Sequence, residues 1–444
     1  MIQLAEPHAA YLTAFESLRL IETSSQVADL RTQGFARFSA LGFPTTKIER
    51  WRFTNVAAIA SSDFRLGEAE EVESSAVASY ELEGVVGPQL VFVNGRFNAA
   101  LSRTDDLPPG VEIGSLAEAL TSKPETVLGH LGSLAQFNSQ PFTALNTAFL
   151  HDGAVVHVSD HAIIEMPVHL LFLTTDTPDQ MNHPRVLVIA GENSQVRVVE
   201  SYVGVGNARY FTNAVTEVVV RDSAIVDHYN LSRDSAAAYH IGSTHVRLGR
   251  SSNFSSHSIT LGGELVCNDV DAELMGEGGE CTLNGLYLVD ARRLVDNHTT
   301  IRHMNPHCAS HELYKGILND EARGVFNGKI IVAIDAQKTD AKQTNKALLL
   351  SEDAQINTKP ELEIFADDVK CTHGATVGQL DEDALFYLRS RGLELDQARS
   401  MLIHAFASDL LQRITIDSIR LQLDAILLQQ LRGSGGPTIY EQPA

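Results

Sequence analysis

One short segment of the sequence places a thiol and an imidazole close together. In KCTHGATVG, residues 370–378, Cys371 and His373 stand two positions apart. On an extended strand alternate side chains share a face, so we expect both groups to point the same way. A thiolate and a neutral imidazole nitrogen both bind iron or zinc, but a closed zinc site or an iron–sulfur cluster takes about four ligands. The pair is therefore an inert buried cysteine beside an ordinary histidine, or half of a site that another chain completes.

A second concentration of candidate ligands lies between residues 298 and 311, and comprises His298, His303, His307, Cys308 and His311. Steps of four residues would align three of these histidines on a helix, but Pro306 stands among them and disfavours a helix. On strands, steps of four leave side chains ~13 Å apart, too far for one ion. We expect these histidines to be hydrogen-bonded structural residues.

Other kinds of chemistry leave no pattern in the sequence. The four cysteines, at 267, 281, 308 and 371, form no C-x-x-C pair and are too few for a secreted disulfide scaffold. The sequence also contains no P-loop, no G-x-S-x-G elbow and no H-E-x-x-H motif. The missing P-loop predicts that this chain does not hydrolyse ATP by means of such a loop.

Charge and hydropathy favour a water-soluble protein. The 34 basic and 56 acidic residues give a formal net charge of −22, which disfavours nucleic acid and anionic membranes as partners. No apolar run approaches the ~18 residues of a membrane helix, and the first residues do not resemble a signal peptide. We expect a cytoplasmic protein.

Helices are predicted at the start of the chain. Apolar residues recur at helical spacing from residue 8 to about 42, where Gly42 and Pro44 end the pattern. Residues 61–88 are acidic and small, which indicates a surface connection. A short strand at 90–93 precedes a turn at Asn94-Gly95, and further helical pieces run from 115 to about 150.

A repeat of strands without helices occupies residues 151–375. A polar or small pair opens a strand at Asn193-Ser194, Asp222-Ser223, Ser251-Ser252, Gly278-Gly279 and His307-Cys308, at offsets of 29, 29, 27 and 29 residues. Two further starts, at Glu321-Ala322 and Asp353-Ala354, follow at offsets of 14 and 32. This period predicts the stacked coils of a β-solenoid. The alternative is a β-sandwich, whose strands would recur every 8–12 residues.

Helices return after residue 381. Asp381 is a plausible N-cap, and Gly392 ends the first helix. A second helix begins near Asp396, and a third covers about 418–432 with one apolar side. The predicted organisation is an N-terminal helical region (1–150), a β-helix core (151–375), a C-terminal helical region (376–432) and a flexible tail (433–444).

A long succession of motifs resembles the SufD family of the SUF iron–sulfur cluster assembly system. The motifs are FPTTKIERWRFTNV at 43–56, ELYKGILND at 312–320, GVFNGKIIV at 324–332, AQKTDAKQTNKALLLS at 336–351 and PELEIFADDVKCTHGATVGQLDEDALFYLRSRG at 360–392. The resemblance implies a right-handed parallel β-helix between helical regions. It is weakest from 61 to 135. The K-C-T-H-G segment favours SufD over the paralogue SufB, whose own cysteine motif is not found here.

The resemblance also implies a function and partners. It implies a non-catalytic scaffold that pairs with SufB and binds the ABC-type ATPase SufC through about 381–432. Clusters would form transiently at the SufB interface, with Cys371 and His373 as ligands and no cofactor permanently bound by this chain. Free solenoid edges can also pair two copies of the chain when SufB is absent.

Two other functions remain open from the sequence. One is a polysaccharide-active β-helix enzyme, for which Asp367 and Asp368 would be the acid pair. Adjacent residues on a strand face opposite ways, so that pair is a poor catalytic couple. The other is a purely structural paralogue that binds SufB and SufC but supplies no ligand.

Overall fold

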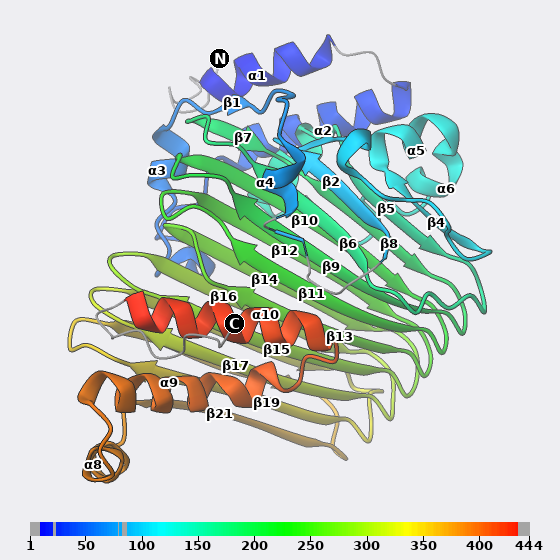
Figure 1. Ribbon diagram of the computed structural model, residues 1–444. Helices are drawn as coiled ribbons and strands as arrows, with labels where there is room; N and C mark the ends of the chain where they lie inside the picture. The colour runs from blue at the N-terminus through cyan, green and yellow to red at the C-terminus, as the bar shows by residue number, and fades with distance from the viewer. Residues whose placement is uncertain (1–8, 21–23, 79, 82–86, 434–444) are drawn as a thin grey trace.

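The computed structural model describes residues 9–20, 24–78, 80–81 and 87–433. The chain forms a two-sheet parallel β-solenoid of about eight coils, with helices at both its N-terminal and C-terminal ends (Figure 1). The predicted mainly-β architecture is confirmed. The predicted tail at 433–444 lies, apart from Gly433, outside the described residues.

Successive strands alternate between two sheets. Sheet A, from the C-terminal end of the stack, contains β20 (Gln355–Ile364), β18 (Arg323–Val332), β16 (Leu294–His303), β14 (Leu265–Leu274), β12 (Tyr239–Leu248), β10 (Tyr210–Val220), β8 (Arg185–Ala190), β5 (Gly153–Val158) and β4 (Val111–Ser115), with β7 (Gln180–Asn182) and β1 (Arg65–Leu66) beside β10. Sheet B contains β21 (Lys370–Gly378), β19 (Asp340–Leu349), β17 (Ala309–Leu318), β15 (Glu280–Val289), β13 (Asn253–Thr260), β11 (Ile225–Arg233), β9 (Gln195–Gly204), β6 (Val168–Thr174), β2 (Gln89–Val93) and β3 (Arg96–Phe97).

The recurring polar pairs mark one corner of each coil, where the chain passes from sheet A to sheet B. A residue with positive φ stands at each of these corners, and small or polar residues tolerate that conformation best. These residues are Asn193 (φ 56°), Ser223 (57°), Ser251 (52°), Gly278 (72°) and His307 (60°). The repeat found in the sequence therefore reflects the regular spacing of these corners along the chain.

The last two predicted strand starts belong to the opposite corner. Glu321-Ala322 and Asp353-Ala354 directly precede β18 and β20, which are strands of sheet A. The offset of 14 residues is thus half a coil. The next corner of the first kind lies at Lys338 (φ 64°), which the pattern missed because lysine is neither small nor a usual turn residue.

The inner faces of both sheets form the main core. Aliphatic and aromatic side chains stack in columns from coil to coil, and one column runs through Val196, Val226, Phe254 and Cys281. Burying each large side chain contributes roughly 1.5–3 kcal/mol. Each coil thereby covers the apolar surface of its neighbour.

The N-terminal pattern is two helices and not one. α1 (Ala9–Arg19) and α2 (Ser25–Leu41) are separate because the Ser24 side chain accepts the Val27 N–H and begins a new helix. Gly42, at φ 65°, ends α2 as predicted. Residue 8 lies outside the described residues.

The shorter N-terminal elements largely follow the sequence pattern. The Asn94-Gly95 turn joins β2 and β3, with both residues at positive φ, as predicted. The described part of the segment 61–88 is not only a surface connection, since it contains β1 and α4 (Ser74–Ala78). The remaining elements are α3 (Ala57–Ser61), α5 (Leu116–Ser122), α6 (Pro124–Leu128), α7 (Pro141–Ala148) and the 3₁₀ turns η2 (Glu49–Trp51) and η3 (Ala99–Leu101).

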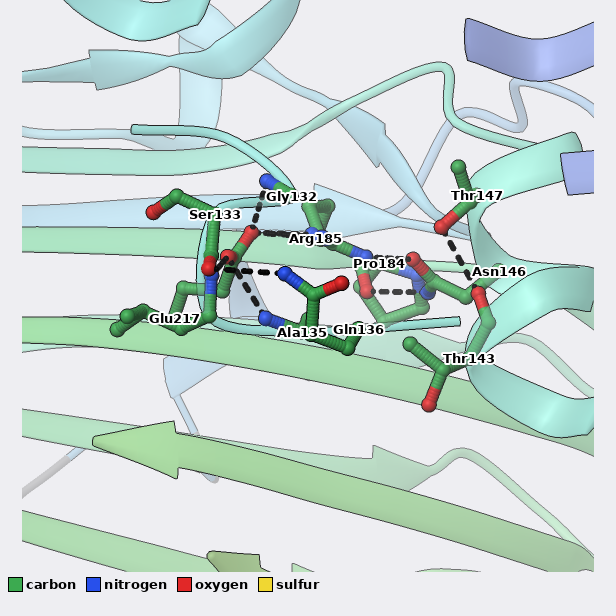
Figure 2. Close-up of polar contacts among 11 residues, drawn as sticks. Gly132, Ser133, Ala135, Gln136, Thr143, Asn146, Thr147, Pro184, Arg185 and Glu217 are labelled. Atoms are coloured by element: carbon green, nitrogen blue, oxygen red, sulfur yellow. Dashed lines mark hydrogen bonds and ion pairs between the residues drawn. The ribbon is translucent and has the colours of Figure 1, made fainter. Parts of the chain in front are cut away.

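A buried ion pair fastens the N-terminal region to the solenoid (Figure 2). The Arg185 guanidinium donates to the Glu217 carboxylate at 2.6 Å, and both side chains are at most 1% exposed. Glu217 also accepts the backbone N–H groups of Gly132, Leu134 and Ala135 at 2.7–3.0 Å. Although burial opposes ionisation, Arg185 and these donors hold the pKa of Glu217 below its usual value.

The C-terminal helices are α8 (Glu382–Ser390), α9 (Leu395–Leu411) and α10 (Asp417–Gly433). Asp381 caps α8 by accepting two backbone N–H groups, and Gly392 (φ 95°) follows the helix, as predicted. The apolar sides of α9 and α10 pack on the outer face of sheet B, where Leu286, Leu313 and Ile317 lie. None of the described helices is long and apolar enough to span a membrane.

Removing the Glu217 carboxylate should destabilise the fold strongly. In Glu217→Leu the buried Arg185 charge loses its counter-ion and three backbone N–H groups lose their acceptor, so we expect the free energy of unfolding to fall by about 3–5 kcal/mol in urea denaturation. The matched control is Glu273→Leu, which removes the exposed ion pair with Arg247 at 3.6 Å and should cost about 0–1 kcal/mol. Equal losses in both variants would contradict the assigned role.

Candidate functional site

The last coil of the solenoid is open. β20 and β21 end the strand order of their sheets, so among the described strands each has one unpaired edge. No residue of β21 is buried, and none of β20 is, whereas β19 has buried residues at alternate positions. The inner face of this coil therefore lacks the next coil that covers every earlier one.

Cys371 and His373 lie on this open inner face. Cys371 is in register with Ala341 and packs against the apolar end of the core, a cluster of Ile330, Val332, Ala336, Ala341 and Ala366. His373 is in register with Gln343 and is exposed. Residues two apart on a strand share a face and have Cα atoms ~7 Å apart, so the predicted strand brings the two donors together.

In the isolated chain, the surroundings of Cys371 favour its protonated thiol over the thiolate. Partial burial and the nearby Asp340 carboxylate raise its pKa above the ordinary value of 9.0, while a hydrogen bond with the Ala341 backbone opposes the rise. Both metal binding and persulfide chemistry at a cysteine need the thiolate form. Binding at Cys371 would therefore release a proton, and a cationic partner at this site would make that release easier.

The histidines at 298–311 do not converge. His298 lies on the outer face of sheet A and pairs with Asp296 at 2.8 Å, whereas His303 lies inside and bonds to the Ser310 hydroxyl at 2.9 Å. His307 occupies a corner, and His311 is exposed on β17. No group of three or more potential metal ligands occurs in the described part of the chain.

The segment 43–56, which carries one of the family-like motifs, packs on the outer face of sheet A. Arg50 pairs with Asp269, and the Thr54 hydroxyl donates to Asp296, both on the outer face of sheet A. Glu49 reaches β20 through an ion pair with Lys359 at 2.5 Å. A cavity of about 230 Å³ remains between this segment and strands β16, β18 and β20. Two cations that line it are already paired, Arg50 with Asp269 and Lys359 with Glu49 and Glu361.

Polar groups inside the solenoid were missed by the sequence analysis. His228 contacts Glu200 at 2.9 Å and Ser256 at 3.2 Å, which resembles a catalytic triad, but all three are at most 4% exposed. Both contacts join adjacent coils: Ser256 is in register with His228, whereas Glu200 lies two residues beyond Val198, the residue in register with His228 on β9. Pairing polar residues at the coil period is the signal that could have found them.

Comparison with known proteins assigns most of the chain to described families. The profile described as "SUF system FeS cluster assembly, SufBD core domain" matches residues 172–406. The profile described as "SufBD protein N-terminal region" matches residues 6–170. Together they span the N-terminal helices, the solenoid and part of the C-terminal helices.

Individual relatives agree with these profiles. An iron–sulfur cluster assembly SufBD family protein of Synechocystis is 35% identical over 93% of this chain and 91% of its own length. The iron–sulfur cluster assembly protein SufD of Escherichia coli is 32% identical over 88% and 90%. The chloroplastic protein ABCI7 of Arabidopsis thaliana is 30% identical over 95% and 88%.

Alkylation should single out Cys371 among the four thiols. Cys267, Cys281 and Cys308 are buried and Cys371 is partly exposed, so we expect iodoacetamide to modify Cys371 first, as followed by mass spectrometry of the native chain. Since its pKa is raised, little of Cys371 is thiolate at neutral pH, and the alkylation rate should climb as the pH rises. In Cys371→Ser the fast phase should vanish; a fast phase that persists would refute this accessibility.

Proposed function

The chain belongs to the SufBD family of SUF-system iron–sulfur cluster assembly proteins, and we propose that it serves there as a non-catalytic scaffold subunit. The single observation that carries the proposal is the open end coil. A thiol and an imidazole lie on the inner face of a coil that a second chain can cover. Family membership counts against the polysaccharide-active alternative, and Asp368 is engaged by Lys338.

In this proposal Cys371 and His373 are ligands of a transient cluster, which is the cargo of the complex. Cys371 supplies a thiolate for iron or for persulfide sulfur, and His373 supplies a neutral nitrogen. Two ligands are about half of what a cluster takes, so the partner supplies the rest. The cluster then belongs to the interface, and neither chain holds it alone.

A SufB-like paralogue is the proposed partner at the end coil. The Lys370 N–H donates to the carbonyl of Thr339, the residue directly before β19, so Lys370 faces β19. Successive residues alternate in direction, so the backbone groups of 371, 373, 375 and 377 point to the free edge. A partner with the same solenoid fold can extend both sheets by pairing with these groups. A second copy of this chain can occupy the same edges when that partner is absent.

A SufC-like ATPase is the proposed partner of the C-terminal helices. The inner sides of α9 and α10 are already used against sheet B, but α8 has no buried residue and lies beyond the sheets (Figure 1). On α8, Phe386 and Tyr387 are 75% and 56% exposed. We place the contact within 376–432, and ATP-driven movement of the ATPase there would shift the population towards an opened interface.

Removing either ligand should weaken cluster formation without breaking the complex. We expect Cys371→Ser and His373→Ala to co-purify with both partners, because neither side chain is buried in the core, yet to give several-fold less cluster by absorbance after reconstitution. Thr372→Val is the matched control, since Thr372 lies between them on the opposite face of β21.

Wild-type cluster yield in both ligand variants would overturn the site. If they also retained both partners, the chain would be the purely structural paralogue. Loss of partner binding in Cys371→Ser would instead show that the thiol contributes to the interface and not to the cluster.

The two proposed partner surfaces can be separated by one pair of variants. Ala375→Pro removes an edge N–H without breaking the ladder to β19, so it should weaken SufB-like pairing and retain the SufC-like ATPase. Phe386→Asp places a charge on the exposed side of α8 and should do the reverse. Each variant is the control for the other in co-purification, and an identical effect of both on the two partners would contradict separate surfaces.

A further inference from the structure

We propose that Gln343, whose amide is oriented by Glu312, positions His373 as a nitrogen ligand. This inference rests on the proposed function, because it concerns how His373 would be prepared for a metal. It assigns a role to two buried residues that do not themselves touch the cargo. Gln343 and Glu312 are positioning residues in this proposal.

The three residues form one column on the inner face of sheet B. Glu312 on β17 is in register with Gln343 on β19, which is in register with His373 on β21. Neighbouring strands are about 4.8 Å apart, so side chains in register stack directly on one another. The column therefore leads from the closed interior to the open end coil.

The nitrogen end of the Gln343 amide already has a hydrogen-bond partner. Its Nε2 donates to Glu312 Oε2 at 2.8 Å, and the side chain is only 2% exposed. Its Oε1 is buried and accepts no hydrogen bond from any residue that the structure describes. An unsatisfied buried acceptor costs about 1–3 kcal/mol, so a donor on the adjacent coil would be favourable.

The His373 ring can be that donor. A neutral imidazole carries one N–H and one bare nitrogen, and the hydrogen bond made by the first decides which nitrogen remains free. If the ring N–H donates to Gln343 Oε1, the other nitrogen keeps its lone pair for a metal. Histidine ligands in proteins are regularly held in this way by an amide, carbonyl or carboxylate oxygen.

Glu312 fixes which end of the amide faces His373. A carboxylate accepts and does not donate, so ionised Glu312 selects Nε2 and leaves Oε1 for the coil beyond. Burial raises the pKa of Glu312 to about 7, against opposing contributions from Thr299 and Gln343. Glu312 is therefore mostly ionised at pH 8, which is the condition for the test.

The neighbouring column supplies a matched control. Asn345 is a second buried amide on β19, two residues from Gln343, and its Nδ2 donates to the Thr358 hydroxyl at 3.0 Å. The residue in register with it on β21 is Ala375, which has no side-chain donor. Loss of the Asn345 amide should perturb the core equally but leave His373 unaffected.

The test measures the His373 tautomer by ¹⁵N NMR of the full-length chain at pH 8, which needs neither partners nor cluster. We expect one dominant tautomer in the wild type and in Asn345→Leu. In Gln343→Met, which keeps the side-chain length, the two tautomers should approach the mixture of a free imidazole. In the reconstituted complex we expect cluster formation by Gln343→Met to fall about tenfold.

An exchange variant distinguishes positioning from simple packing. In Glu312→Gln/Gln343→Glu the amide donates to the carboxylate, and the other carboxylate oxygen faces His373, so the single tautomer should return. An unchanged tautomer in Gln343→Met would overturn the inference, as would a tautomer that the exchange variant fails to restore while its melting temperature stays normal. Should Gln343→Met fail to fold, the single variant Glu312→Gln must also mix the tautomers.

The two measurements test the ligand role of His373 and the positioning role of Gln343 separately. Normal cluster yield in His373→Ala refutes the proposed ligand, whatever the tautomer. A normal yield in Gln343→Met, with a reduced yield in His373→Ala, leaves the proposed function intact and refutes the positioning role alone.

Discussion

The in-register pairing of each coil on the next is the interaction on which the whole structure depends. Every strand from β8 to β19 has a parallel neighbour on both sides, so the backbone groups of one coil are satisfied by two others. The same register stacks the inner side chains into continuous columns. A coil at an end of the stack has a neighbour on one side only, so its other side is left without backbone partners and without a covering coil.

The two ends of the stack differ: the N-terminal end is closed by other elements, whereas the C-terminal end is open on its inner face. At the N-terminal end, antiparallel β3 and β4 terminate the sheets, and the Arg185–Glu217 pair binds the helical region to sheet A. At the C-terminal end, α9 and α10 cover the outer face of sheet B but leave the inner face of β20 and β21 open. An open end coil suits the proposed assembly scaffold, and it is where Cys371 and His373 lie.

Much of the fold could be predicted because it depends on local residues. Small or polar residues at the corners gave the coil period, and Asp381 and Gly392 gave the bounds of α8, since caps and turns act within a few positions. Contacts between residues of different coils could not be predicted in the same way. Coil lengths vary: Tyr239 pairs with Leu265 and Arg323 with Gln355, offsets of 26 and 32 residues, so cross-coil partners cannot be counted from one fixed period.

The sequence by itself determined the solenoid, its terminal helices and the shared face of Cys371 and His373, because alternation on a strand is a property of the backbone. Only the tertiary structure decided that this face belongs to the one coil left open at the C-terminal end. It also decided that Glu312 and Gln343 lie beneath His373. Those contacts depend on register between strands about 30 residues apart, which is fixed by packing of the whole stack and not by any local signal.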